Sequence, residues 1–286
     1  MEEHTIGGGG ISATVRAAGA ELCRLQDGGR DLLWDAGPMW PSHSPVLFPV
    51  VGQVTGDCVL VGGRSYPMPR HGFARRRGFA WLDAGADACT LQLQDDAESR
   101  AVFPFAFQLT LAYRVAGDAL HVDYTLANPG PDVLLASLGA HPAFRWPLGG
   151  GAQTDYRIEF AVDEDAPIRR LDAGLLRVAA QPSPVQGRTL ALDPGLFLDD
   201  AILMLEPRSR SLRYLGRDAG IEFAWHGFPY LGLWQKPGAA LLCIEPWHGY
   251  ASPVGWDGEL RDKPGLMLVQ PGEARRMGWS VRPLRA

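Results

Sequence analysis

The sequence lacks any long hydrophobic run, any excess of positive charge and any secretory leader. No apolar stretch approaches the roughly 20 residues that a transmembrane helix needs. Residues 1–4, MEEH, are acidic and polar, unlike a signal peptide. The 286 residues include 27 Lys and Arg against 32 Asp and Glu, a formal net charge of -5, whereas nucleic-acid binders usually present a basic face. These absences predict a cytoplasmic protein that binds neither membranes nor nucleic acid.

Cysteine pairs and metal-ligand spacings are absent as well. The four cysteines, Cys23, Cys58, Cys89 and Cys243, are widely spaced and form no CxxC pair, which predicts free, buried thiols and no disulfide. The seven histidines show no HxxxH or HxH spacing, so the sequence predicts no zinc site. Residues 7–10 are glycines without the Lys-Ser/Thr end of a phosphate loop. No metal and no cofactor is therefore expected.

Amphipathic helical patterns are almost missing, and alternation with a period of two residues dominates. Hydrophobic and polar residues alternate over 109–115 and again over 120–126, on either side of Gly117-Asp118, which predicts an antiparallel hairpin. The same alternation recurs at 91–93, 156–162, 221–225 and 277–281. Together with 35 Gly and 23 Pro, it predicts many short strands joined by turns. No composition break marks a linker, so we predict one all-β domain over residues 1–286, built as two packed sheets or a closed barrel.

Three short segments, each beside Gly or Pro, hold the residues best suited to proton transfer. They are residues 70–75 (RHGFAR), 139–144 (GAHPAF) and 270–273 (QPGE). Their two histidines and one glutamate can be tuned to titrate near neutral pH, which suits general acid–base catalysis. Such residues flank many unrelated pockets, so the chemistry alone does not name a reaction.

Together these segments resemble the aldose 1-epimerase (galactose mutarotase-like) superfamily, in particular its LacX-type branch. Segments 47–49 (LFP), 227–230 (GFPY) and 243–247 (CIEPW) carry the same resemblance, which runs in order from about Phe48 to Trp279. The resemblance implies a large antiparallel β-sandwich with a sugar cleft on one concave sheet. It also implies an isomerase that interconverts the α and β anomers of a free hexose or related aldose, with no metal or cofactor.

The resemblance implies roles for individual residues. His141 matches the family's general acid and Glu273 its catalytic base, while His71 matches the histidine that holds the sugar ring. Arg75, in the same segment as His71, is expected to bind a hydroxyl or an anion. Without the resemblance, Glu273 would be an exposed turn residue, the two histidines would be a core and a loop histidine, and residues 75–77 would be a solvated basic run.

Two further segments supply candidates for sugar binding. Trp247 is expected to offer its indole face to the apolar side of a pyranose. Glu245 would bind sugar hydroxyls, or would instead brace Arg75 or a histidine. Gln235 is a weaker candidate for hydroxyl binding.

Two departures from the family pattern bear on the substrate. LacX-type relatives usually carry Arg after the Phe-Pro-x-Val-Gly stretch, whereas Gln53 stands here, so a guanidinium anchor is missing unless Arg64 or Arg75 replaces it. The hexose-6-phosphate branch typically has Arg-Gly-Gly before its Phe/Trp-Pro segment, whereas residues 42–44 are Ser-His-Ser. This favours a free sugar, although residues 75–77 could still supply charge.

Two alternatives to a free-aldose epimerase stay open. One is a hexose-6-phosphate 1-epimerase, and the other is a non-catalytic carbohydrate-binding domain on the same scaffold, because function resides in the site and not in the fold. The expected partner is a small sugar molecule, and the sequence is compatible with a monomer or a homodimer.

Overall fold

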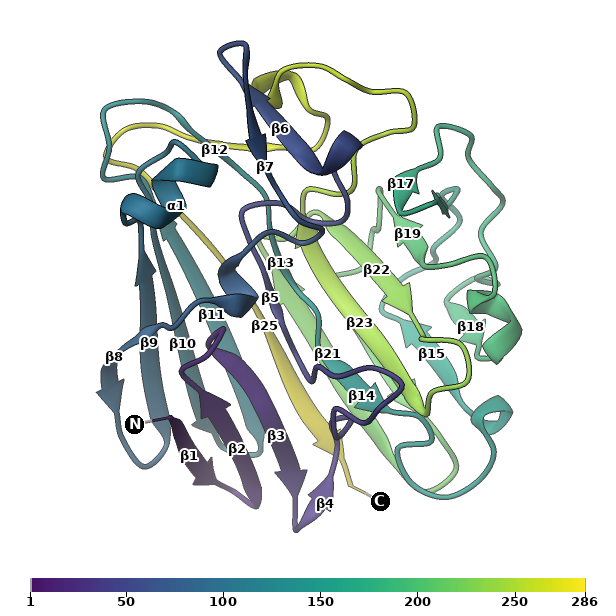
Figure 1. Ribbon diagram of the computed structural model, residues 1–286. Coiled ribbons are helices and arrows are strands. Elements are labelled where there is room, and N and C mark those ends of the chain that lie inside the picture. Colours follow the sequence, from purple (N-terminus) through teal and green to yellow (C-terminus); the bar gives the residue numbers. More distant parts are fainter. Residues whose placement is uncertain (1, 286) are drawn as a thin grey trace.

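The computed structural model describes residues 2–285 and consists almost entirely of antiparallel strands (Figure 1). Within this range α1 (Ala97–Val102) is the only α-helix, and it starts at Asp96, whose side chain accepts a hydrogen bond from the Ser99 N–H. Short 3-10 turns lie at Thr55–Asp57, Ala74–Arg76, Gln153–Asp155, Pro194–Phe197 and Leu260–Asp262. None of the helices in residues 2–285 is long and apolar enough to cross a membrane.

A nine-stranded sheet forms the back layer in Figure 1, in the order β18-β15-β20-β21-β25-β11-β10-β9-β8. Its strands are β8 (Ala80–Ala84), β9 (Ala88–Gln94), β10 (Gln108–Ala116), β11 (Ala119–Ala127), β15 (Arg157–Phe160), β18 (Thr189–Ala191), β20 (Ser211–Leu215), β21 (Gly220–His226) and β25 (Ala274–Leu284). The predicted hairpin is confirmed as β10 and β11, with Leu111 opposite Tyr124. The other predicted alternations lie in β9, β15, β21 and β25, although β15 is shorter than predicted.

Two smaller sheets lie in front of the nine-stranded sheet (Figure 1). The four-stranded sheet contains β1 (Glu3–Gly8), β2 (Ile11–Arg16), β3 (Glu21–Asp27) and β4 (Arg30–Asp31). The six-stranded sheet has the order β19-β22-β23-β13-β5, and β14 also pairs with β23. Its strands are β5 (Val46–Leu47), β13 (Leu138–Ala140), β14 (Ala143–Arg145), β19 (Ile202–Met204), β22 (Tyr230–Trp234) and β23 (Leu241–His248). Three strand pairs complete the fold: β6 (Cys58–Val61) with β7 (Arg64–Pro67), β12 (Leu134–Ala136) with β24 (Met267–Val269), and β16 (Leu171–Asp172) with β17 (Leu175–Leu176).

The core lies between these layers and follows from the alternation in the sequence. Side chains two residues apart point to the same face of a strand, so one face of each long strand is buried. On the nine-stranded sheet, Phe223 and Trp279 stack on neighbouring strands with ring centroids 5.4 Å apart. The main cluster of buried hydrophobic side chains extends from Ile6 to Val281 along the chain. The predicted antiparallel β-sandwich is confirmed.

Candidate active site

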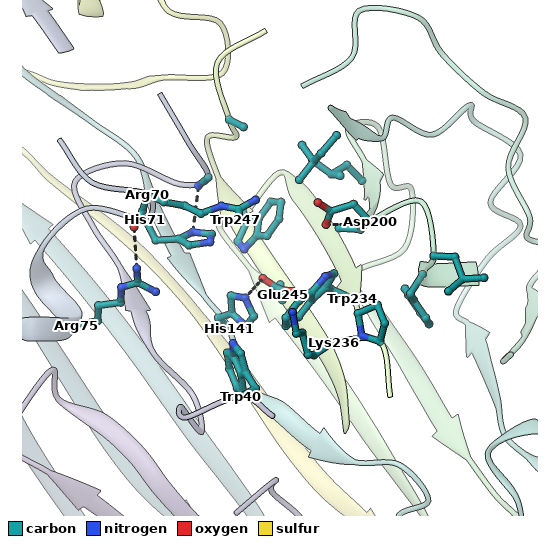
Figure 2. Close-up of a pocket in the computed structure, with 18 residues that line it drawn as sticks. Trp40, Arg70, His71, Arg75, His141, Asp200, Trp234, Lys236, Glu245 and Trp247 are labelled. Atoms are coloured by element: carbon teal, nitrogen blue, oxygen red, sulfur yellow. Dashed lines mark hydrogen bonds and ion pairs between the residues drawn. The ribbon is translucent and has the colours of Figure 1, made fainter. Parts of the chain in front are cut away.

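A cavity of about 420 Å³ opens on the six-stranded sheet, between that sheet and the loops around it (Figure 2). Its polar and aromatic lining comes from segments far apart in the sequence: Trp40, Arg70, His71, Arg75, His141, Phe197, Asp200, Trp234, Lys236, Glu245 and Trp247. The volume falls in the range of small-molecule sites, about 300–1,000 Å³. It is therefore the candidate active site.

Strand register brings His141 and Glu245 together at the floor of the cavity. Gly139 pairs with Trp247 in β13, and Ala143 pairs with Cys243 in β14. The same register, continued through the gap between the two strands, sets His141 opposite Glu245. Its Nε2 lies 3.0 Å from Glu245 Oε2, and Figure 2 shows the two side chains directed at one another. Directly opposed side chains are close enough to interact.

Burial shifts both members of this pair toward their uncharged forms. It lowers the pKa of His141 to about 3, and it raises the pKa of Glu245 well above its ordinary value, with the carboxylate of Asp200 adding to the effect. Both directions follow from the cost of holding a charge away from water. The state with neutral imidazole and protonated carboxyl holds the same number of protons as the ion pair. One proton can therefore pass between the two groups without changing the net charge of the site.

Glu245 differs from the other buried glutamates in the partners of its carboxyl group. Glu21 accepts hydrogen bonds from the backbone N–H groups of His43 and Ser44, and Glu164 accepts them from Arg208 and Ser209. By contrast, Glu245 is 1% exposed, and its Oε2 lies 3.0 Å from the His141 imidazole nitrogen and accepts no hydrogen bond from a backbone N–H among residues 2–285. A carboxyl oxygen has two lone pairs, so a ligand hydroxyl in the cavity could donate to the same atom.

His71 enters the cavity from a strained turn. Its φ is 65° and that of Gly72 is 70°, a left-handed conformation that costs little only for glycine. A Cβ on Gly72 would lie 2.2 Å from the Phe48 carbonyl oxygen, so glycine is required there. The Gly52 N–H donates to His71 Nδ1 at 3.1 Å. Burial holds the pKa of His71 well below its usual value, so the neutral ring carries its proton on Nε2 and can donate it to a ligand oxygen.

Arg75 and Arg70 add positive charge to the same wall of the cavity. Arg75 lies in the 3-10 turn Ala74–Arg76, and its Nη2 donates to the Arg70 carbonyl oxygen at 2.9 Å. Its buried Nε has no partner within the described chain. The predicted placement of Arg75 in the cleft, apart from Arg76 and Arg77, agrees with the structure, since neither neighbour lines the cavity.

Aromatic rings complete the cavity. Trp247 lines it from β23, and its buried Nε1 has no hydrogen-bond partner among residues 2–285. The ring fits over Gly232 of β22, where a Cβ would lie 2.7 Å from its Cη2 atom. Trp40 stacks on the His141 imidazole with centroids 5.2 Å apart and planes 24° apart, and thereby fixes the plane of that ring (Figure 2). Flat apolar faces beside unpaired donors suit a sugar ring.

The expectation that Glu273 shares this cleft is wrong. Glu273 precedes β25 of the nine-stranded sheet, its side chain is 48% exposed, and its carboxylate lies 3.3 Å from Arg275. It does not line the cavity. Its turn is instead hydrogen-bonded to the end of β11, because the N–H of Asn128, which directly follows this strand, donates to the Glu273 carbonyl oxygen. The buried carboxylate beside His141 belongs to Glu245, which the sequence had suggested only for hydroxyl binding or bracing.

Gln235 and Gln53 also lie outside the cavity. Gln235 is buried, and its Nε2 donates to the Ala239 carbonyl oxygen at 2.8 Å, so it holds the turn after β22. Its neighbours Trp234 and Lys236 line the cavity in its place, because successive side chains of an extended chain point to opposite faces.

The Gln53 side chain donates a hydrogen bond to Asp57 at 3.2 Å. The missing guanidinium near Gln53 is not replaced by Arg64, which lies over the Tyr66 ring and lines no part of the cavity.

Six of the polar and aromatic lining residues were not predicted as site residues: Trp40, Arg70, Phe197, Asp200, Trp234 and Lys236. Arg70 directly precedes His71, so the motif itself contained the signal. Asp200 has a left-handed φ of 62°, and its carbonyl oxygen accepts a hydrogen bond from Arg170; no local pattern in the sequence marks it.

Two residues of the cavity floor, together with the buried Cys243, form a set of donor atoms that could hold a metal. One ligand atom from each of His141, Cys243 and Glu245 lies within 4.8 Å of the other two. Histidine spacing could not reveal this set, because it assembles across two strands.

Known proteins resemble this chain along its whole length. The aldose 1-epimerase family matches residues 2–253, a range that includes Glu245 and ends before Glu273. Protein LacX of Lactococcus lactis subsp. lactis is 27% identical over 286 residues, which cover 95% of this chain and 96% of LacX.

Solved structures show the same fold. A galactose mutarotase related enzyme from Lactobacillus acidophilus superposes with a TM-score of 0.91 at 27% identity, covering 99% of this chain and 97% of that one. A galactose mutarotase-like protein from Lactobacillus casei ATCC 334 superposes with a TM-score of 0.91 at 26% identity, covering 99% of this chain and 100% of that one. The chain therefore belongs to the aldose 1-epimerase family.

Proposed function

We propose that this protein is an aldose 1-epimerase that interconverts the α and β anomers of a free hexose or related aldose, with His141 and Glu245 as its acid and base. The observation that supports this most strongly is the buried pair itself, with Nε2 and Oε2 3.0 Å apart at the floor of the cavity. Two groups whose surroundings tune their pKa values are the usual sign of an acid/base pair.

The reaction moves one proton on and another off. Glu245 removes the proton from the anomeric hydroxyl while protonated His141 gives its proton to the ring oxygen, and the C1–O5 bond breaks to leave an open-chain aldehyde. Rotation about C1–C2 presents the other face of the carbonyl. The O5 hydroxyl then attacks C1 and returns its proton to His141, while Glu245 returns its proton to the carbonyl oxygen. The proton of Glu245 must first pass to His141 to form the ion pair that burial disfavours; the ring-opening transfer then discharges this pair and is not opposed by the surroundings.

The remaining residues of the cavity bind the sugar. The His71 Nε2–H and the unpartnered Arg75 Nε offer hydrogen bonds to sugar oxygens, and donors of this kind can stabilise charge on the ring as it opens. Trp247 offers its indole N–H and its ring. Asp200, across the cavity, is an acceptor for hydroxyl groups.

A hexose-6-phosphate 1-epimerase is the second candidate, because of the charge at the edge of the cavity. Arg70 and Lys236 are exposed side chains that line it, and neither forms an ion pair with another of residues 2–285. A phosphate could engage them, and a charge-assisted contact contributes about 1.5–3 kcal/mol. Against this, Asp200 lines the same cavity and would repel a phosphate, so the free sugar stays the preferred substrate.

The test is anomer-exchange NMR of the full-length protein with glucose, galactose and glucose 6-phosphate at equal ionic strength. The proposal expects exchange above the uncatalysed rate, with a higher kcat/KM for a free hexose. A phosphate ester preferred by tenfold or more, about 1.4 kcal/mol, would replace the free sugar as substrate. Binding of a sugar without any exchange would instead support a carbohydrate-binding domain.

A further inference from the structure

Cys243 lies directly beside the proposed acid/base pair and has no part in the sugar chemistry. It precedes Glu245 by two residues on β23, so the two side chains point to the same face of the sheet. One donor atom from each of Cys243, Glu245 and His141 lies within 4.8 Å of the other two, and all three residues are buried. Cys243 is a free thiol.

We propose that His141, Cys243 and Glu245 form a binding site for one thiophilic divalent cation, such as Zn²⁺ or Cd²⁺, whose binding excludes the sugar. Imidazole, thiolate and carboxylate are all ligands of such cations. The imidazole and carboxyl atoms are already 3.0 Å apart, so bonds of about 2.0–2.3 Å mainly require the Cys243 sulfur to move toward them, by up to about 1 Å. Three protein ligands leave a fourth position open to water in the cavity. Thiolate favours these soft cations over Mg²⁺, which prefers oxygen ligands.

Unsatisfied atoms in the cluster point to a ligand. His141 Nδ1 is buried without a hydrogen-bond partner among residues 2–285, and Glu245 Oε2 faces the His141 Nε2 atom at 3.0 Å without a backbone donor; the two residues are 7% and 1% exposed. The other buried glutamates are held by backbone N–H groups, with the Arg16 guanidinium on the second oxygen of Glu21. A cation would bind a lone pair of Glu245 Oε2 that no backbone group occupies. Binding releases the Cys243 thiol proton and the Glu245 carboxyl proton to solvent, because both groups bind a metal in their deprotonated forms.

Competition with the sugar follows from shared atoms. The Glu245 carboxylate and the His141 imidazole are the groups that the proposed reaction needs, and a cation bound to both would make them unable to accept or give a proton. The site therefore makes the cation an inhibitor of the proposed epimerase. This consequence rests on the proposed function, whereas the binding of the cation does not.

The experiment is a titration of the full-length, chelator-treated protein with CdCl₂. Binding is measured by calorimetry and by the sulfur-to-cadmium charge-transfer absorption in the ultraviolet. The variants are Cys243→Ala and a matched control, Cys89→Ala. Cys89 is also a free, fully buried thiol, but it lies on β9 in the other sheet. Circular dichroism checks the fold of each variant. If Cys243→Ala does not fold, Cys243→Ser and the stoichiometry of the wild-type absorption band take its place.

Wild type and Cys89→Ala are expected to bind one Cd²⁺ ion and to show the sulfur-to-cadmium absorption band. Cys243→Ala is expected to lack this band and to bind Cd²⁺ at least about tenfold more weakly. A sugar that the enzyme uses should weaken Cd²⁺ binding, by the reciprocity of linked sites, and MgCl₂ should not compete. An unchanged band in Cys243→Ala, or no band in wild type, would overturn the proposal. An inactive protein that still binds Cd²⁺ through Cys243 would refute the epimerase and leave the cation site standing.

Discussion

Two glutamates of this chain lie in contrasting surroundings. The contrast shows that a sequence motif at a turn does not by itself identify a residue of the active site. Glu273 follows a Pro-Gly turn on the nine-stranded sheet, with its side chain 48% exposed and close to Arg275. Glu245 lies within β23 of the six-stranded sheet, 1% exposed and 3.0 Å from His141. Only Glu245 lines the cavity. The residue at the more conspicuous turn is ordinary surface, whereas the residue within the buried strand has the environment of a catalytic group.

The difference has a simple physical origin. A carboxylate in water costs nothing to expose and gains little from a surface ion pair. A carboxylate out of water costs several kcal/mol unless it is paired or protonated, so a buried carboxyl group that lines a cavity is a candidate functional group. Burial together with convergence on a cavity therefore identifies the functional residue better than a turn sequence does.

The largest expected loss of activity comes from replacing the histidine of the His141–Glu245 pair. His141→Asn should lower kcat by about 100- to 10,000-fold, because general acid catalysis contributes a factor of this size. His248→Asn is the matched control, since His248 lies on the same sheet but does not line the cavity. Anomer-exchange NMR measures both. Equal losses in the two variants would show that the sheet, and not the pair, was disturbed.

Lys263 is a buried charged residue outside the cavity, and it tests whether burial alone identifies a functional group. It is 3% exposed, its Nζ donates to the Tyr250 carbonyl oxygen, and it does not line the cavity. Burial lowers the pKa of Lys263 from 10.5 to about 8. Below pH 8 the folded protein carries the buried ammonium at a cost of about 3 kcal/mol. Between pH 8 and 10.5 the unfolded chain binds more protons, so this contribution to stability rises with pH.

Lys263→Met should therefore gain stability relative to wild type at pH 7, and that difference should shrink by up to about 3 kcal/mol by pH 10.5. Urea unfolding of both proteins at both pH values measures the difference in their free energies of unfolding. Groups other than Lys263 titrate equally in the two proteins, so their contributions cancel in this difference. Epimerase activity should stay within about twofold. A pH-independent difference would show that Lys263 keeps an ordinary pKa in the fold.

A smaller effect is expected from disturbing the aromatic wall beside Glu245. In Gly232→Ala the new Cβ would lie 2.7 Å from Trp247 Cη2. Displacing the indole should cost about 1–3 kcal/mol of stability and raise KM for the sugar more than it lowers kcat. Gly78→Ala is the control, because a Cβ there meets no atom within 4 Å. An unchanged KM in Gly232→Ala would remove Trp247 from the sugar site.

Much of the fold could be predicted from the sequence because strand periodicity is local. The alternation over residues 109–115 and 120–126 predicts both strands of the β10–β11 hairpin and the face that each buries. His71 was predicted because residues 70–75 resemble a segment of the family. Both signals lie within a few residues of one another along the chain. The steric reason for Gly72, by contrast, is the Phe48 carbonyl in a distant segment.

The partner of His141 could not be predicted in this way. Its identity depends on the register of β13 and β14 against β23, a pairing of segments about 100 residues apart. Gln235 failed for a related reason: the lining residues are its neighbours Trp234 and Lys236. A shift of one residue along an extended chain moves every side chain to the other face, and composition does not determine which face meets the cavity.

The central claim is that Glu245, and not Glu273, is the base. The most direct measurement compares kcat for Glu245→Gln and Glu273→Gln by anomer-exchange NMR on a sugar that the wild type uses. Glutamine keeps the shape of each side chain but cannot accept the anomeric proton. We expect kcat to fall by about 100- to 10,000-fold for Glu245→Gln and to stay within about twofold for Glu273→Gln. Retained activity in Glu245→Gln together with its loss in Glu273→Gln would contradict this account.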